Sequence, residues 1–454
     1  MTAVGLAACL AGAPIASAQP PALVAQATAG DYYTRGVANV TEQNYGEAIA
    51  NFDQAIAIDP DYAAAYLYRG FAHIALDNES AAIADYDRAI ALNPTYGEAY
   101  YNRGIAYYNL GDLQQALADF DQAVQIEPTN ARAYLYRGIA QAAQGDRTAA
   151  AADFEQATQL QPDLAEAHFH RGTTQMELGD SEGAIVHLSR AIQIQPRYAK
   201  AYLNRGSAQY ASGNRQAAVA DFDRAIELAT DSPTAYFNRG FVLSDLGALD
   251  QALADFNQAI TLKPDYTEAY LGRAVVRLAL ANRQGAFEDL NRVIALDPSS
   301  SEAYKRRADI RLQTGDPEGA IQDYTQALTI QPDHAEALSG RATARLALGD
   351  SGGANEDYTQ AIYFNPGNAQ ALGNRGAIRS TLGDRQGALE DYTQAIRYNP
   401  ENADTYYSRG RLRVEIGDRS GAMDDFGRAS ELYLQQGQAE GYRNVLRSIS
   451  SLQQ

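Results

Sequence analysis

Arginine is the residue whose spacing in this sequence most directly suggests chemistry. A guanidinium group holds phosphate or carboxylate through two parallel hydrogen bonds, so a regular row of arginines predicts either an anion-binding surface or a ladder of internal ion pairs. One arginine, followed each time by Gly or Ala, recurs every 34 residues. The twelve members of this row are Arg35, Arg69, Arg103, Arg137, Arg171, Arg205, Arg239, Arg273, Arg307, Arg341, Arg375 and Arg409.

A residue of opposite charge recurs with the same period. Sixteen residues after the arginine, ten of the twelve periods carry an aspartate, and Asn51 and His187 interrupt the series. These aspartates are Asp85, Asp119, Asp153, Asp221, Asp255, Asp289, Asp323, Asp357, Asp391 and Asp425. Because a carboxylate follows the guanidinium in step, we interpret the row as internal salt bridges between facing helices.

A second arginine row begins only in the last five periods, four residues after the first. It consists of Arg277, Arg311, Arg345, Arg379 and Arg413. At the same boundary, the residue before the recurring aspartate changes from Ala or Val to an acid or amide. These residues are Glu288, Gln322, Glu356, Glu390 and Asp424. We expect the two sets to pair with each other rather than to bind an external anion. The change divides the array into sub-arrays 29–266 and 267–436.

Histidine is the other residue type that could carry chemistry. The sequence has five: His73, His168, His170, His187 and His334. His168 and His170 point in different directions on a predicted helix, and zinc needs three or four convergent ligands. The sequence contains no HExxH motif, glycine-rich phosphate loop or nucleophile elbow. We therefore predict no catalytic residue, no metal, no cofactor and no enzymatic activity.

The overall charge argues against one class of partner. The 454 residues include 56 acidic and 37 basic side chains, for a net charge of -19. Such a field repels the phosphates of nucleic acid and of anionic lipid, so nucleic acid is not expected as a partner. Basic, neutral and apolar protein surfaces remain candidates.

The first eighteen residues differ in composition from the rest of the chain. They contain an apolar run and end in Ala16-Ser17-Ala18, the small-residue pattern of a signal-peptidase site. We expect a signal peptide over residues 1–18, a flexible lead-in over 19–28, and a periplasmic or extracellular protein.

Two features of this segment leave alternatives. No basic residue precedes the apolar run, so a cytoplasmic location follows if the segment does not function in export. Cys9 lies in a sequence that resembles a lipobox. Membrane contact is expected only through lipidation at Cys9 or through a partner.

Each 34-residue period is predicted to hold two helices joined by a short turn. Apolar and small residues between positions 99 and 128 form two helical stripes, interrupted by Leu110-Gly111-Asp112. Gly111 suits the positive φ that ends a helix, and Asp112 suits the capping of the next one. Ala248 is the exception to this capping pattern. In the other eleven repeats the cap is Asn44, Asn78, Asp112, Asp146, Asp180, Asn214, Asn282, Asp316, Asp350, Asp384 or Asp418.

These repeats resemble the tetratricopeptide repeat. The Gly or Ala after the arginine is counted as position 8, and the family's residues at positions 4, 8, 20, 24, 27 and 32 are then met almost throughout. In the third repeat they are Tyr100, Gly104, Ala116, Phe120, Ala123 and Pro128. The match spans twelve in-phase repeats over residues 29–436. The resemblance implies an all-α, right-handed superhelical solenoid of antiparallel helix pairs. Residues 437–454 are expected to form a capping helix.

The resemblance also places the first helices on a concave binding wall. Positions 5, 9 and 12 of the first four repeats are mostly large and apolar, which predicts a groove for a protein or peptide partner. The predicted groove residues are Tyr33, Val37, Leu67, Phe71, Tyr101, Ile105, Tyr108, Leu135 and Ile139. The alternative is that these side chains pack against neighbouring repeats or against a second copy of the protein.

The sequence thus predicts a scaffold or adaptor of an exported compartment. It would bind a peptide or amphipathic helix during assembly or secretion of an envelope or membrane complex. Two other functions stay open: a structural homo-oligomer that self-associates through the same strip, and a non-catalytic subunit of an enzyme complex.

Overall fold

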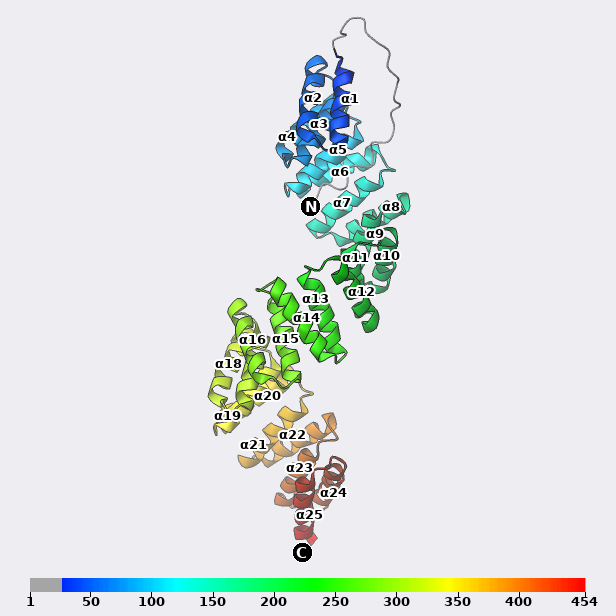
Figure 1. Cartoon of the computed structure of the whole chain (residues 1–454). Coiled ribbons are helices and arrows are strands. Elements are labelled where there is room, and N and C mark those ends of the chain that lie inside the picture. Colours follow the sequence, from blue (N-terminus) through cyan, green and yellow to red (C-terminus); the bar gives the residue numbers. More distant parts are fainter. Residues whose placement is uncertain (1–26, 454) are drawn as a thin grey trace. The chain divides into compact units, whose positions relative to one another are not determined.

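A computed structural model describes residues 27–453 (Figure 1). The predicted signal peptide, Cys9 and most of the predicted lead-in lie outside these residues. Within them every regular element is an α-helix, which confirms the all-α prediction. The chain divides into two compact units between Asp231 and Ser232. Residues up to 231 are called unit 1 and residues from 232 unit 2.

Unit 1 contains repeats 1 to 6, each of them a pair of helices. Every helix in it packs against the next along the chain. The helices are α1 (Ala29–Thr41), α2 (Tyr45–Ile58), α3 (Ala63–Ala75), α4 (Glu79–Leu92), α5 (Gly97–Asn109), α6 (Leu113–Ile126), α7 (Ala131–Gln144), α8 (Arg147–Leu160), α9 (Ala165–Glu177), α10 (Ser181–Ile194), α11 (Ala199–Ala211) and α12 (Arg215–Leu228).

Unit 2 contains repeats 7 to 12 and one further helix, again packed consecutively. The helices are α13 (Pro233–Asp245), α14 (Leu249–Leu262), α15 (Thr267–Ala279), α16 (Arg283–Leu296), α17 (Ser301–Gln313), α18 (Pro317–Ile330), α19 (Ala335–Ala347), α20 (Ser351–Phe364), α21 (Ala369–Thr381), α22 (Arg385–Tyr398), α23 (Ala403–Glu415), α24 (Arg419–Gln435) and α25 (Ala439–Gln453).

The turn within each pair is built largely as predicted. Gly111 has φ +81°, and the side chain of Asp112 accepts a hydrogen bond from the backbone NH of Gln115 at 3.1 Å. Nine of the eleven predicted caps accept such a bond. Asn44 and Asn214 accept no capping bond from the described residues. The turn therefore forms even where its cap is weak, because packing of the two helices holds it.

Small residues at positions 8 and 20 let the two helices approach closely. In repeat 3 a Cβ atom built on Gly104 would lie 2.7 Å from the ring of Phe120, so this ring packs directly on the glycine backbone. Ala116 and Phe120 are fully buried in the same interface. The recurring Gly after the arginine is thus a consequence of packing.

First helices form the inner wall of each unit. Within a unit, alternate first helices contact each other directly, for example α1 with α3 and α17 with α19. Among the described helices, no two alternate second helices make a contact of that extent. The first helices are therefore the more closely spaced row. Their side chains that point away from the second helices are the natural place for a binding site.

The last helix covers the end of the stack. Val445 of α25 is fully buried against α24, and Tyr442 and Ile449 pack on the same cluster, whereas Leu446 is 41% exposed. None of the helices within residues 27–453 is both long enough and apolar enough to span a bilayer.

Candidate functional site

The recurring arginine connects three helices. In repeat 4, Nε and Nη2 of Arg137 on α7 each donate to a carboxylate oxygen of Asp153 on α8 at 2.7 Å. Its Nη1 donates to Asp121 on α6 at 2.8 Å, and its guanidinium carbon lies 5.4 Å from the ring centroid of Tyr134. The hydrogen bonds to Asp153 raise the pKa of Arg137 although burial opposes this. One side chain therefore joins two successive repeats.

All ten predicted arginine–aspartate pairs are present. Their Nη2–Oδ1 distances are 2.6 or 2.7 Å in every case. The aspartate side chains are at least nine-tenths buried, so each pair lies in a partly desolvated interior. Because their guanidinium hydrogens face internal acceptors, these ten arginines brace the fold and do not form an anion site.

The second arginine row binds the same aspartates. In repeat 10, Nη1 of Arg345 lies 2.9 Å from Asp357 Oδ2 and donates to the backbone oxygen of Gly353 at 2.9 Å. Asp357 also accepts from Nε and Nη2 of Arg341 at 2.9 and 2.7 Å. The equivalent contacts in repeats 8, 9, 11 and 12 measure 2.8, 3.0, 3.2 and 2.9 Å. Each of these aspartates is therefore held between two guanidinium groups.

The predicted partner of this second row was wrong, although the prediction of an internal pair is confirmed. Glu356 and its equivalents at position 22 are exposed, whereas the arginine contacts the aspartate at position 23. Neighbouring residues on a helix point about 100° apart, so only one of the two faces the first helix.

Glycine at position 19 is a sequence feature that accompanies the second arginine. A Cβ atom on Gly353 would lie 2.3 Å from Oδ2 of the capping Asp350 and 3.1 Å from Nη1 of Arg345, so glycine leaves room for both side chains. This glycine recurs in each repeat that has the second arginine: Gly285, Gly319, Gly353, Gly387 and Gly421.

The predicted apolar groove of unit 1 is only partly open. Four of its nine residues are buried: Leu67 and Leu135 are 1% exposed, and Tyr101 and Ile105 are 7% exposed. They belong to the core between successive repeats. The five that keep partial exposure on the inner wall are Tyr33, Val37, Phe71, Tyr108 and Ile139.

Aromatic packing fixes the position of the first of these side chains. The ring of Tyr33 lies 5.0 Å from that of Tyr62 and 5.7 Å from that of Tyr68, centroid to centroid. Burial raises the pKa of Tyr33 above its ordinary value, and its hydroxyl stays protonated at neutral pH. Tyr33 therefore presents a rigid, uncharged aromatic edge.

A polar hollow of about 440 Å³ lies on the inner wall of unit 2, between α17, α19 and α21. On one side, Lys305 Nζ lies 2.8 Å from Glu336 and 3.2 Å from Asp309, and the hydroxyl of Tyr324 donates to Asp309 at 2.6 Å. Burial opposes the charge of Lys305, but the hydrogen bond to Glu336 and the two carboxylates raise its pKa. Lys305 is therefore a fixed ammonium.

Hydroxyl and amide groups form the other side of this hollow. Asn374 donates to the hydroxyl of Tyr358 at 2.9 Å, and that hydroxyl lies 2.9 Å from the hydroxyl of Thr343. Gly340 is essential to the shape, because a Cβ atom there would lie 2.4 Å from the ring of Tyr324. The polar types of these positions are visible in the sequence, but the hollow itself is not.

Repeat 5 of unit 1 replaces two of the usual contacts of its arginine. His168 occupies the aromatic position 4 and His187 the aspartate position 23. Their Nδ1 atoms lie 3.2 Å apart, and Nε2 of His168 lies 3.2 Å from the backbone oxygen of Pro162. Arg171 donates to Thr158 at 3.0 Å and lies 3.4 Å from Glu155.

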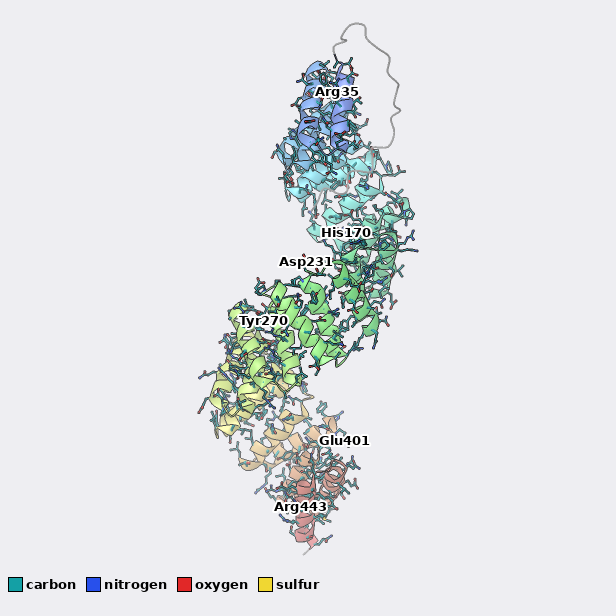
Figure 2. The ribbon with its side chains drawn as sticks, viewed as in Figure 1. Arg35, His170, Asp231, Tyr270, Glu401 and Arg443 are labelled. Carbon is teal, nitrogen blue, oxygen red and sulfur yellow. The ribbon has the colours of Figure 1, made fainter. Side chains whose placement is uncertain are left out.

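The ring of the neighbouring His170, labelled in Figure 2, stacks on that of Phe154 with the ring centroids 5.5 Å apart. Within residues 27–453, no group of three or more His, Cys, Asp or Glu side chains is arranged to hold a metal ion.

Family models described as "Tetratricopeptide repeat" or "TPR repeat" match most of the chain. The matched residues are 36–77, 80–111, 97–130, 132–163, 174–213, 199–232, 233–266, 271–335, 305–369 and 381–417. No curated protein sequence matches the chain.

Several solved structures share the fold. The Cut9–Hcn1 hetero-tetramer of the APC/C is 11% identical, with 93% of this chain and 97% of that chain covered and a TM-score of 0.48. A repeat protein from Parabacteroides merdae is 22% identical, with 55% and 98% covered and a TM-score of 0.43. YrrB, described as "a TPR protein with an unusual peptide-binding site", is 23% identical, with 40% and 95% covered and a TM-score of 0.36. These likenesses concern the fold alone.

Proposed function

The chain belongs to the tetratricopeptide repeat family, and from this premise we propose that it is a non-enzymatic scaffold that binds a peptide or amphipathic helix along the inner wall of unit 1. One observation carries the proposal. Five large apolar side chains remain partly exposed on that wall, although each also packs against the core between repeats. Such a row gains free energy when a partner removes it from water, at roughly 25 cal/mol per Å² of apolar surface.

The type of residue in this row also supports recognition of another protein. Tyr33, Phe71 and Tyr108 are aromatic, and their packing against neighbouring rings limits the entropy lost on binding. An amphipathic helix or an extended apolar segment could place alternate side chains between them.

The polar hollow of unit 2 offers a second kind of contact. Its ammonium, carboxylate, hydroxyl and amide groups suit the polar side chains or main chain of a bound segment. We assign it a supporting role in the same scaffold function, because it also lies on first helices.

The compartment is part of the proposal. The small-residue pattern that ends at Ala18 supports export, and therefore a role in assembly or secretion of an envelope or membrane complex. Cleavage after Ala18, seen by mass spectrometry of the mature protein, would support this location; an intact Met1 in the native protein would contradict it.

Peptides selected from a displayed library on the full chain provide the test. Tyr108→Glu is expected to weaken their binding at least tenfold, because it places a charge in the middle of the apolar row. The control is Leu110→Glu, which changes a 55% exposed apolar residue two positions away and should leave affinity unchanged. Equal effects of both variants would contradict the proposal, as would a concentration-dependent dimer in light scattering that Tyr108→Glu dissociates. The latter result would instead favour the structural homo-oligomer.

A further inference from the structure

Repeat 5 is the place in unit 1 where a pair of neutral histidines replaces a buried carboxylate. A backbone carbonyl only accepts hydrogen bonds, so the contact between Nε2 of His168 and Pro162 places a proton on Nε2. Nδ1 of His168 is then the acceptor of the 3.2 Å contact, and Nδ1 of His187 is the donor. This arrangement needs the ring of His168 to be neutral, because its Nδ1 must keep a free lone pair.

A further proton has no favourable place in this pair. On Nδ1 of His168 it would set two N–H groups against each other at 3.2 Å. On Nε2 of His187 it would add a positive charge beside Arg171. The first change breaks the hydrogen bond between the two rings, and the second places two positive charges side by side between α9 and α10.

The charges around the pair do not offset this cost. Arg171 on α9 and Arg190 on α10 oppose protonation, whereas Glu155 on α8 and Asp180 at the start of α10 favour it. Glu155 is 53% exposed and already contacts Arg171, so solvent and that ion pair reduce its effect on the histidines. On the other side of α9, Lys200 on α11 opposes protonation of His170.

We propose that repeat 5 is an acid-sensitive joint, in which protonation of the His168–His187 pair loosens α9 from α10 and interrupts the helix stack of unit 1. The equivalent level of repeat 4 is held by the ion pair of Arg137 and Asp153, and no histidine occurs in repeat 4. Acidification therefore acts on one repeat and spares its neighbour.

The pKa shifts agree with this geometry. Burial, and then the charge of Arg171, lowers the pKa of His187 to about 4, and burial with Lys200 lowers that of His170 to about 4. A base whose pKa is lower in the folded state binds fewer protons when folded than when unfolded. Its contribution to stability is therefore complete above the unfolded pKa of about 6.5 and is lost as the pH falls toward 4.

Hydrogen exchange on the full chain, corrected for the intrinsic pH dependence of exchange, tests the proposal. Between about pH 7 and pH 4.5, opening of α9 and α10 should increase at least tenfold more than opening of α7 and α8. His187→Asp should reduce this excess at least severalfold, because it restores the carboxylate present in ten other repeats, and the remainder should come from His170. His73→Gln, a histidine change in repeat 2, should leave the excess intact.

Two results would overturn the proposal. Parallel loss of protection in repeats 4 and 5 is one, and an excess that His187→Asp leaves at its full size is the other. Titration of 15N-labelled histidines by NMR gives an independent measurement, in which a pKa of His187 near 6.5 rather than near 4 would also contradict it. None of these readouts involves a partner, so they stand apart from the proposed binding function.

Discussion

Repeat 4 of unit 1 and repeat 10 of unit 2 use the same arginine and the same aspartate in opposite proportions. In repeat 4 of unit 1, one guanidinium lies between two carboxylates, those of Asp153 and Asp121. In repeat 10 of unit 2, one carboxylate, that of Asp357, lies between Arg341 and Arg345. At the outer position Thr325 replaces an acid and accepts from Arg341 at 3.3 Å. The fold tolerates both proportions because the bidentate pair at the centre is the same.

This difference shows why the net charge of a segment says little about its binding surface. Residues 1–231 contain 27 acidic and 14 basic side chains, and residues 232–454 contain 29 and 23. Five of the additional arginines in unit 2 point inward to the aspartates. Much of the additional positive charge of unit 2 is therefore used in internal ion pairs and does not add to the charge of its surface.

Loss of the shared aspartate should separate the two units most clearly. Asp357→Asn leaves two partly buried guanidinium groups facing a neutral side chain, and we expect a loss of about 3 to 5 kcal/mol in the local free energy of opening. Asp153→Asn leaves Arg137 with Asp121 and should cost about 1 to 3 kcal/mol. Hydrogen exchange of α19–α20 and α7–α8 measures these losses in the full chain. Equal losses of free energy in the two variants would show that the second arginine does not make the stability of its repeat more dependent on the aspartate.

The second arginine itself should matter less than the first. Arg345→Gln introduces the residue that Gln141 provides at this position in repeat 4, and Asp357 keeps its bidentate partner, so we expect a loss of about 1 kcal/mol. Arg341→Gln removes the bidentate pair and should cost two to three times as much by the same measure. A reversed order in urea denaturation of the two variants would mean that the second row, not the first, braces unit 2.

The outer carboxylate of unit 1 should have the smallest effect. Asp121 is 62% exposed, so Asp121→Asn is expected to change stability by less than about 1 kcal/mol. That small loss should vanish at high salt, where exposed charges are screened, whereas the loss caused by Asp153→Asn should persist. Thermal unfolding at low and high ionic strength compares the two. If the loss of stability caused by Asp121→Asn did not depend on salt, the Arg137–Asp121 contact would be as well shielded from solvent as the Arg137–Asp153 contact.

Local pattern was enough to predict the arginine ladder but not the second row. The interval between Arg137 and Asp153 recurs through the chain, and a helix pair with a tight turn brings those two positions face to face. For Arg345 the sequence offered Glu356 and Asp357 as neighbours, and the direction of each side chain decided between them. Glycine at position 353 accompanies this arrangement, because a Cβ there would crowd both the capping Asp350 and the second guanidinium.

The predicted groove is a second feature that the sequence pattern predicted only in part. Leu67 and Phe71 stand four residues apart on one helical face, yet Leu67 is buried between repeats and Phe71 keeps partial exposure. Periodicity assigns both to one stripe, and the position of the neighbouring first helix separates them. The predicted role of the exposed members stays a prediction until a partner is measured.

The sequence by itself determined the period, the helix pairs, the turns and the bidentate ladder, because each depends on residues within one 34-residue unit or on its exact repetition. Tertiary structure alone decided which apolar side chains reach the surface, where Gly340 opens the polar hollow, and how His168 meets His187. Those features depend on distances of a few ångströms between helices of successive repeats or between the two helices of one pair. Such distances are set by the packing of whole side chains, which the period of a sequence does not contain.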